Sequence, residues 1–199
     1  MQYFFTSDTH FGDDDKLTRE NWITKNWQKF AKKLIKIWNK QVKKHDVVYF
    51  LGDFINYENA ENDWREAFGL VKKIKAKCIL IIGNNEERLI KDKFNGSFNK
   101  FRQFCIESGF TDVKKHDILK SGKLKFYLIH KPTDYKKGYI NLFGHTHLAT
   151  GLWKPFGFNV YYGLNFLKLF DLDYIKRLLY VKQKYWDQDE NNWFMGEEK

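Results

Sequence analysis

The sequence predicts an α/β fold built on a layered, at least partly parallel sheet, and three observations support this. Short apolar segments of strand length alternate with segments of helical periodicity over the first eighty or so residues. Two apolar runs, residues 47–51 and 78–82, are continuous rather than alternating, as in strands buried on both faces. The order strand, helix, strand, helix, strand is typical of parallel pairing with helical connections.

The chain has the size and composition of one globular domain. It has 199 residues, of which 43% are hydrophobic and 30% charged, with 13 glycines and 2 prolines, so low-complexity and disordered classes are excluded. No repeat, proline-rich linker or break in composition divides it. We therefore expect a single domain over residues 1–183 and a loosely held C-terminal tail over residues 184–199.

Charge, cysteine content and hydropathy narrow the class of protein. Lys and Arg number 35 against 25 Asp and Glu, a net charge of +10 that permits an anionic partner without requiring one. Two cysteines are too few for a disulfide framework. Apolar runs stop far short of the ~20 residues of a membrane span, and the first eight residues lack the basic start of a signal peptide. We expect a soluble, cytoplasmic protein with no membrane partner.

The first half of the chain gives the clearest elements. Residues 2–7 predict a strand, residues 21–44 an amphipathic helix, and residues 64–75 a second helix between the two continuous strands. The polar face of the first helix is either a solvated face or an anion-binding stripe. Its lysines recur at helical period: Lys25, Lys29, Lys32, Lys36, Lys40 and Lys43.

The second half is less regular. Residues 98–107 and 172–181 have helical periodicity. Strands are expected on either side of Ser121-Gly122, followed by two shorter ones; their ranges are 113–119, 124–129, 139–143 and 159–162.

Polar residues of metal-binding type follow five of these strands. Ligands bind outside the carboxyl ends of strands in an open α/β sheet, so distant loops can converge there. Two carboxylates, one amide and four imidazoles suit Mn, Zn, Fe, Co or Ni, and seven groups fit two ions sharing a bridging carboxylate better than one ion. The candidates are Asp8, His10, Asp53, Asn84, His130, His145 and His147.

The ordered set Asp8-Thr9-His10, Gly52-Asp53, Gly83-Asn84, His130 and Gly144-His145-Thr146-His147 resembles the calcineurin-like metallophosphoesterase superfamily, and most of all its small bacterial and phage branch. The likeness extends to Ile37-Trp38-Asn39 and to Leu51-Gly52-Asp53-Phe54. It covers about residues 2–181, and an ordered match of five parts is far more specific than any one part. The resemblance implies a two-layered β-sandwich with flanking helices, in the order α-β-β-α.

The resemblance also implies a role for each candidate ligand. Two divalent ions are implied, with manganese favoured and Zn, Fe, Ni or Co as alternatives, and with a bridging hydroxide that attacks phosphorus. Their charge of +4 against −2 from the two carboxylates leaves a cationic site able to bind phosphate oxygens. Asp8, His10 and His147 would hold the first ion, Asn84, His130 and His145 the second, and Asp53 would bridge them.

One residue departs from the family pattern. The commonest form of the third motif has a histidine after the ligand asparagine, beside the scissile bond, and this chain has Asn85. An amide can donate a hydrogen bond but cannot deliver a proton, which puts general-acid help worth roughly 10²–10⁴-fold in doubt. Asn85 and Asp53 are the candidate catalytic residues. A substitute acid could come from a lysine near Lys131 or from residues 13–15, although acidic runs are also typical of turns and helix caps.

Two functions from different classes are consistent with these residues. The first is a metal-dependent phosphoesterase that prefers phosphodiesters, acting on a nucleotide, a cyclic nucleotide or a nucleic-acid end. The second is a catalytically weak binding or scaffold module on the same fold. The seven candidate ligands favour the first, and Asn85 keeps the second open. His45 and His116 lie outside the motifs and are expected at the surface.

Overall fold

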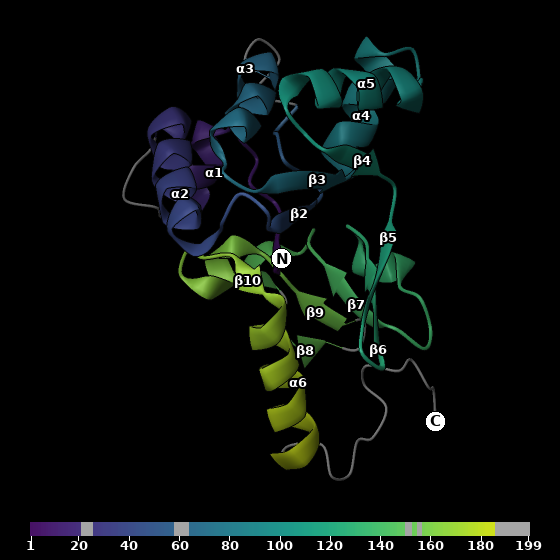
Figure 1. Cartoon of the computed structure of the whole chain (residues 1–199). Coiled ribbons are helices and arrows are strands. Elements are labelled where there is room, and N and C mark those ends of the chain that lie inside the picture. The colour runs from purple at the N-terminus through teal and green to yellow at the C-terminus, as the bar shows by residue number, and fades with distance from the viewer. Residues whose placement is uncertain (21–25, 58–63, 150–152, 155–156, 186–199) are drawn as a thin grey trace.

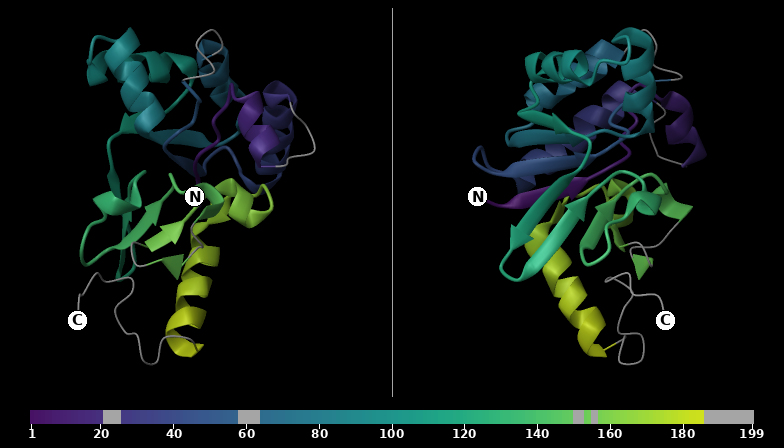
Figure 2. Two further views of the ribbon diagram at one scale, coloured as in Figure 1. Left: turned by 180° about the vertical axis from the view of Figure 1, so that it is seen from behind. Right: turned by 90° about the vertical axis from the view of Figure 1, so that its right-hand side faces the viewer.

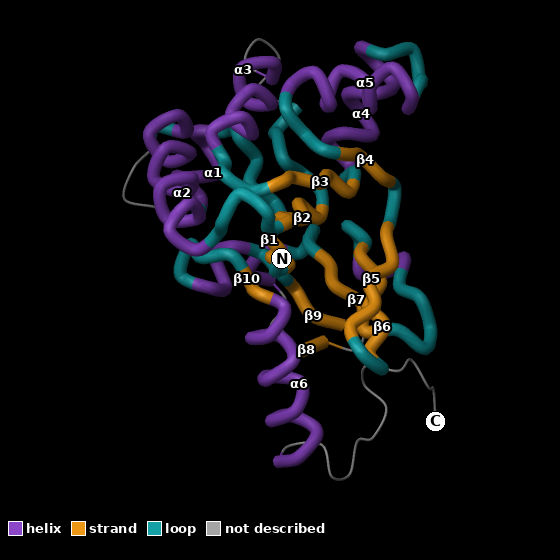
Figure 3. The backbone as a smooth tube through the Cα atoms, in the orientation of Figure 1, coloured by secondary structure: helices purple, strands orange, loops and turns teal. Residues whose placement is uncertain are grey.

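The structure, a computed structural model, describes residues 1–20, 26–57, 64–149, 153–154 and 157–185 (Figure 1). Its elements form two five-stranded sheets that are flanked by helices. The mixed α/β architecture predicted from the sequence is therefore confirmed. Figure 3 distinguishes the strands of both sheets from the loops that follow them, and those loops carry the predicted site.

The first sheet has the strand order β10-β1-β2-β3-β4. Strands β1 to β4 run parallel to one another, and β10 lies antiparallel along the free side of β1. The bounds are β1 Tyr3–Thr6, β2 Val47–Leu51, β3 Lys77–Ile81, β4 Asp112–Lys114 and β10 Phe170–Asp171.

The second sheet has the strand order β5-β6-β7-β9-β8. Its three central strands are parallel, and the two edge strands are antiparallel to their neighbours. The bounds are β5 Asp117–Ser121, β6 Leu124–Leu128, β7 Ile140–Phe143, β8 Trp153–Lys154 and β9 Gly157–Asn159.

Two strand predictions were wrong in their bounds. Residues 113–119 are not one strand, because the chain leaves the first sheet after β4 and enters the second at β5. Residues 159–162 are not a strand either. Strand β9 ends at Asn159, the 3-10 helix η4 (Tyr162–Asn165) follows, and Tyr161 makes only an isolated bridge to Ser7.

Helices cover the outer face of the first sheet and extend past its edge (Figure 2). Helix α3 continues into the 3-10 helix η1 (Leu70–Lys73), and two further 3-10 turns, η2 (Pro132–Asp134) and η3 (His147–Ala149), follow β6 and β7. The α-helices are α1 Asp14–Arg19, α2 Trp27–Gln41, α3 Trp64–Gly69, α4 Asn84–Lys93, α5 Phe98–Ser108 and α6 Leu172–Tyr185.

The helix predictions were incomplete in three places. Helix α2 begins only at Trp27, because the side chain of Asn26 accepts a hydrogen bond from Lys29 N and caps it, and residues 21–25 lie outside the described residues. Helix α1 was not predicted, and Asp13 accepts from Lys16 N at its start, as a helix cap does. Helix α4 was not predicted, because it begins directly at the motif residue Asn84.

The first sheet is buried on both faces, which explains its continuous apolar strands. Val48 and Phe50 of β2 pack in the core beneath helices α2 to α5. Their neighbours Tyr49 and Leu51 point the other way, into the core between the two sheets. The buried residues of α6 join this second core near β1 and β10.

The predictions on the lysine stripe, the C-terminal tail, the cysteines and membrane spans are only partly covered by the described residues. The described lysines of the α2 stripe are exposed, Lys25 lies outside the described residues, and neither interpretation of the stripe is tested. Residues 186–199 of the predicted tail also lie outside them. Both cysteines are buried. No helix in the described ranges is long and apolar enough to cross a membrane.

Trp38 ties α2 to the segment before β10 and gives a stability prediction. It is fully buried, and its Nε1 donates to the Leu167 carbonyl at 2.9 Å. Trp38→Phe leaves that carbonyl without its donor and replaces a larger ring, so the free energy of unfolding should fall by about 1–3 kcal/mol in urea titrations. The exposed Lys36→Ala on the same helix should change it by less than about 0.5 kcal/mol. Equal stability of the two variants would contradict this role.

Candidate metal centre

The structure brings the seven predicted side chains together at the carboxyl ends of strands from both sheets. The first sheet supplies four of them from the loops after β1, β2 and β3, and the second sheet supplies three after β6 and β7. The site therefore lies where the two sheets meet. In strand order the residues are Asp8 and His10, Asp53, Asn84, His130, then His145 and His147.

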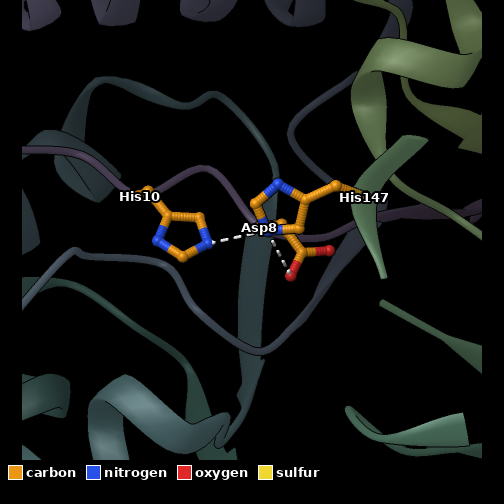
Figure 4. Close-up of side chains that lie close together, drawn as sticks. All are labelled: Asp8, His10 and His147. Carbon is orange, nitrogen blue, oxygen red and sulfur yellow. Dashed lines mark hydrogen bonds and ion pairs between the residues drawn. The ribbon is translucent and has the colours of Figure 1, made fainter. Parts of the chain in front are cut away.

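Asp8, His10 and His147 form a first group whose ligand atoms lie within 4.8 Å of one another (Figure 4). His10 Nε2 lies 3.1 Å from His147 Nε2, which in turn lies 3.7 Å from Asp8 Oδ1. Asp8 is held across the sheets, because His145 N donates to its Oδ1 at 2.9 Å. The loop after β7 thus positions a side chain of the loop after β1.

Asp53, His130 and His145 form a second such group, and Asn84 lies against it. Asn84 Oδ1 is 3.0 Å from both His130 Nε2 and His145 Nδ1. The two imidazoles approach each other to 3.3 Å.

Asp53 lies between the two groups. Its Oδ2 is 3.6 Å from His10 Nε2, and its Oδ1 is 3.5 Å from His130 Nε2. Each carboxylate oxygen therefore faces a different group, which is the arrangement that a ligand shared between two ions requires.

The orientation of the imidazoles fits a cation in each group. His130 Nδ1 lies 2.8 Å from the Leu51 carbonyl and His147 Nδ1 lies 2.9 Å from Glu20 Oε1, so both Nδ1 atoms donate. The Nε2 atom of each ring then faces other groups that accept hydrogen bonds. Acceptors that face one another need a shared positive charge, and imidazole, carboxylate and amide oxygen are suitable ligands for a borderline divalent ion.

The pKa shifts agree with this picture. Burial lowers the pKa of His10 and of His145, so both rings are neutral and have a lone pair at neutral pH. Burial also opposes charge on His130, but Asp53 outweighs it and raises the pKa of His130 to about 9. Burial raises the pKa of Asp53 in turn, and the neighbouring His130 reverses this and holds it below its ordinary value. The pair therefore holds a proton where a bound cation would compete with it.

The backbone at the site is strained. Five of the eight non-glycine residues with positive φ in the described chain are predicted ligands. Such residues are uncommon and cost on the order of 1–3 kcal/mol each, so they cluster where surrounding structure holds them. Their φ values are Asp8 55°, His10 43°, Asp53 50°, His145 70° and His147 46°.

Hydrogen bonds between neighbouring loops hold this strained backbone. Asp8 N donates to the Gly52 carbonyl and His10 N to the Asp53 carbonyl, both at 3.0 Å. Gly52 itself has φ +83°, and a Cβ there would overlap the His130 ring. Gly83 has φ −106° and is needed for space instead, since a Cβ would collide with Asp53.

Sequence reasoning missed Glu20 as part of the site. Its carboxylate accepts from His147 Nδ1 through Oε1 and from the Tyr161 hydroxyl through Oε2. The buried Lys16 ammonium lies 3.9 Å from Glu20 Oε1 and donates to the Asp8 carbonyl, and burial lowers the pKa of Lys16. No motif marks either residue. Glu20 fixes the ring orientation and tautomer of His147, the usual role of a partner behind a metal-binding histidine.

Asn85, Asp13 and Asp14 contact the backbone and neighbouring side chains. Asn85 is buried, its Oδ1 accepts from Tyr57 N at 3.2 Å, and its own N–H donates to Asp53 Oδ1 at 3.0 Å. Asp13 is buried and accepts from Lys16 N and from the Asn56 amide, so it serves structure. Asp14 likewise accepts from Trp27 N.

Comparison with known proteins places the chain in a family. The model of the calcineurin-like phosphoesterase family matches residues 1–194, and the chain belongs to that family. A relative from Methanocaldococcus jannaschii, the uncharacterized protein MJ1445, is 32% identical over 129 residues, which is 65% of this chain. The match spans 58% of that relative's length. Family membership supports a metal-dependent hydrolase of phosphate esters.

One solved structure, with a TM-score above 0.5, has the same fold as this chain. The Aquifex aeolicus protein AQ665, described as of unknown function, matches with a TM-score of 0.60 and 20% identity over 89% of this chain and 98% of its own. The E. coli phosphoesterase YfcE matches with a TM-score of 0.40 and 14% identity over 74% of this chain and 70% of its own. The second likeness is too low to carry a conclusion.

Glu20 gives a prediction that is specific to the first group. Glu20→Ala removes the acceptor of His147 Nδ1 and should weaken Mn²⁺ binding by roughly 10–100-fold in calorimetric titrations. Glu20→Gln keeps an acceptor oxygen, and Tyr161→Phe keeps the carboxylate, so both should stay within about threefold of the parent protein. If Glu20→Ala bound Mn²⁺ as tightly as Glu20→Gln, Glu20 would have no positioning role.

Proposed function

We propose that this protein is a dinuclear metal-dependent phosphoesterase that prefers phosphodiesters. The observation that carries the proposal is the position of Asp53, whose two oxygens face two separate groups of ligand atoms. Asp8, His10 and His147 would hold one ion and Asn84, His130 and His145 the other, with Mn²⁺ as the proposed metal and Zn, Fe, Ni or Co as alternatives.

The residues of the chain set the net charge of this centre and hold its ligands in place. Two divalent ions, when bound, supply Lewis acidity toward phosphoryl oxygens and lower the pKa of water. The two carboxylates contribute −2, so the loaded site stays positive and attracts a phosphate ester. The interlocked loops and the buried Glu86 hold the ligands, so little reorganisation is needed during reaction.

The preference for diesters follows from Asn85. Its amide nitrogen can donate a hydrogen bond to a phosphoryl or leaving oxygen, but it cannot release a proton near neutral pH. A monoester with a poor leaving group needs that proton far more than an activated diester does. Nucleotides, cyclic nucleotides and nucleic-acid ends are the proposed phosphodiester substrates.

A binding or scaffold module is the second candidate. The observation that favours it is Asn85 itself, a buried amide held by Tyr57 N, which cannot release a proton at the position where the commonest family motif has a histidine. Elemental analysis combined with hydrolysis of an aryl phosphodiester and its matching monoester, with Mn²⁺ added, separates the two candidates. Two bound ions with diester turnover support the enzyme, and two bound ions without turnover of either ester support the scaffold.

Asp53→Asn tests the shared ligand. The substitution removes the negative charge between the two groups, so binding of both ions should weaken. Loss of a residue that only orients a metal ligand lowers activity by up to about 100-fold, so loss of a shared ligand should lower diester kcat/KM by more than that. Asp92→Asn, the same change at an exposed position of α4, should leave both unchanged. Near-normal turnover with two bound ions in Asp53→Asn would show that Asp53 is not the bridge.

Asn85→His tests the substrate preference. The parent protein should have a higher kcat/KM for the aryl diester than for the monoester. In the variant, Tyr57 N can donate to one ring nitrogen and leave the proton on the other, so monoester hydrolysis should rise by at least tenfold. Glu86 cannot orient that ring, because its oxygens already accept from Gly83 N, Asp53 N and Phe54 N. A parent protein that already prefers the monoester would contradict the diesterase proposal.

A further inference from the structure

A cavity of about 500 Å³ opens beside the second group of ligands. Gly83 and His130 form part of its wall, so one end of the cavity reaches the proposed metal centre. Three buried isoleucines, Ile82, Ile90 and Ile129, give it an apolar lining. Its volume falls in the range of roughly 300–1,000 Å³ that is typical of small-molecule sites.

Two aromatic rings and an imidazole line the same cavity from different elements. Phe98 is the first residue of α5 and Tyr127 lies in β6, and both are half-buried, so part of each ring remains accessible. His116, between β4 and β5, packs on Tyr127 with ring centroids 5.4 Å apart. His116 is exposed as expected from the sequence, but it borders a cavity that the sequence did not reveal.

Charged groups around the cavity favour an anion. The lining carries three lysines and two carboxylates, Glu87 and Asp134, so its lysines and acids alone have an excess of one positive charge. Lys131 Nζ lies 3.8 Å from Glu87 Oε2, and Lys115 Nζ lies 5.8 Å from the centre of the Phe98 ring. Within the described part of the chain, Lys115 and Lys91 have no carboxylate partner, so both can contact a ligand.

These features together match a planar, partly apolar group attached to a phosphate. We propose that the cavity binds the nucleoside portion of a nucleotide-type phosphate ester, with the base against Phe98 and Tyr127 and with the positive charge of the lysines attracting the anionic ester. The inference rests on the proposed function, because it takes the scissile phosphate to lie at the metal centre beyond His130. An inorganic polyphosphate would leave the isoleucine lining and the rings unused, and a hydrocarbon chain would leave the lysines unused.

Binding to the full chain, measured by calorimetry after treatment with EDTA, tests the cavity without relying on turnover. AMP and GMP should bind at least tenfold more tightly than ribose 5-phosphate, because base stacking on aromatic side chains is worth roughly 1–3 kcal/mol. Tyr127→Ala should remove most of that difference, and Lys115→Ala, at an exposed position, should weaken all three phosphates alike. Lys120→Ala on the neighbouring strand β5 lies outside the cavity lining and should change nothing.

Turnover with Mn²⁺ then separates this inference from the proposed function. Tyr127→Ala should lower kcat/KM for a dinucleotide about tenfold and leave kcat/KM unchanged for a phosphodiester that carries no aromatic ring. Equal affinity of the parent protein for AMP and ribose 5-phosphate would overturn the nucleoside site even if diesters are cleaved. Tight, Tyr127-dependent AMP binding without cleavage of any diester would support the site and overturn the phosphoesterase.

Discussion

The carboxylate of Glu86 holds together the two loops on which the centre depends. It is fully buried and accepts from Gly83 N in its own turn and from Asp53 N and Phe54 N in the neighbouring loop, at 2.8–2.9 Å. Burial raises the pKa of Glu86 to about 7, although the backbone N–H donors stabilise the charged carboxylate and so act to lower the pKa. Because Asp53 belongs to the loop that Glu86 holds, the residue that lies between the two groups is positioned by a carboxylate that is not itself a candidate ligand.

The rest of the centre follows from the meeting of two sheets. Loops from one sheet carry Asp8 and Asp53, and loops from the other carry the histidines that face them. Left-handed backbone at five of these positions costs energy, and hydrogen bonds such as Asp8 N to the Gly52 carbonyl offset it. Bound cations would therefore connect the two halves of the core, in addition to any role in catalysis.

The sequence allowed prediction of those parts whose signal is local. Strand β2 was predicted with its observed bounds, because a continuous run of five apolar residues ends at a glycine. The candidate ligands could be named because each follows a strand in a short motif, and the structure brings all seven together; their binding of metal stays a prediction. Helix α4 was missed because its first residues coincide with a motif and were interpreted as a turn.

Features that depend on distant contacts could not be predicted. Glu20 contacts His147, 127 residues away, and nothing near Glu20 distinguishes it from other surface acids. Residues 113–119 are divided between two sheets because of where the second sheet packs. The sequence of one apolar segment contains no information about that packing. The cavity around Tyr127 likewise arises only when α4, α5 and β6 are assembled.

The pairing of β1 has a consequence for the order in which the molecule is completed during synthesis. Strand β1 can pair with β2 early, but among the described residues its other edge is covered by β10, and Ser7 is bridged by Tyr161. Until β10 has been made, an apolar edge strand stays open to pairing with other chains. Tyr161 also stacks on His147, with ring centroids 5.2 Å apart. A short stretch of chain, residues 161–171, thus supplies both the strand that protects this edge and a ring that packs against the candidate metal centre.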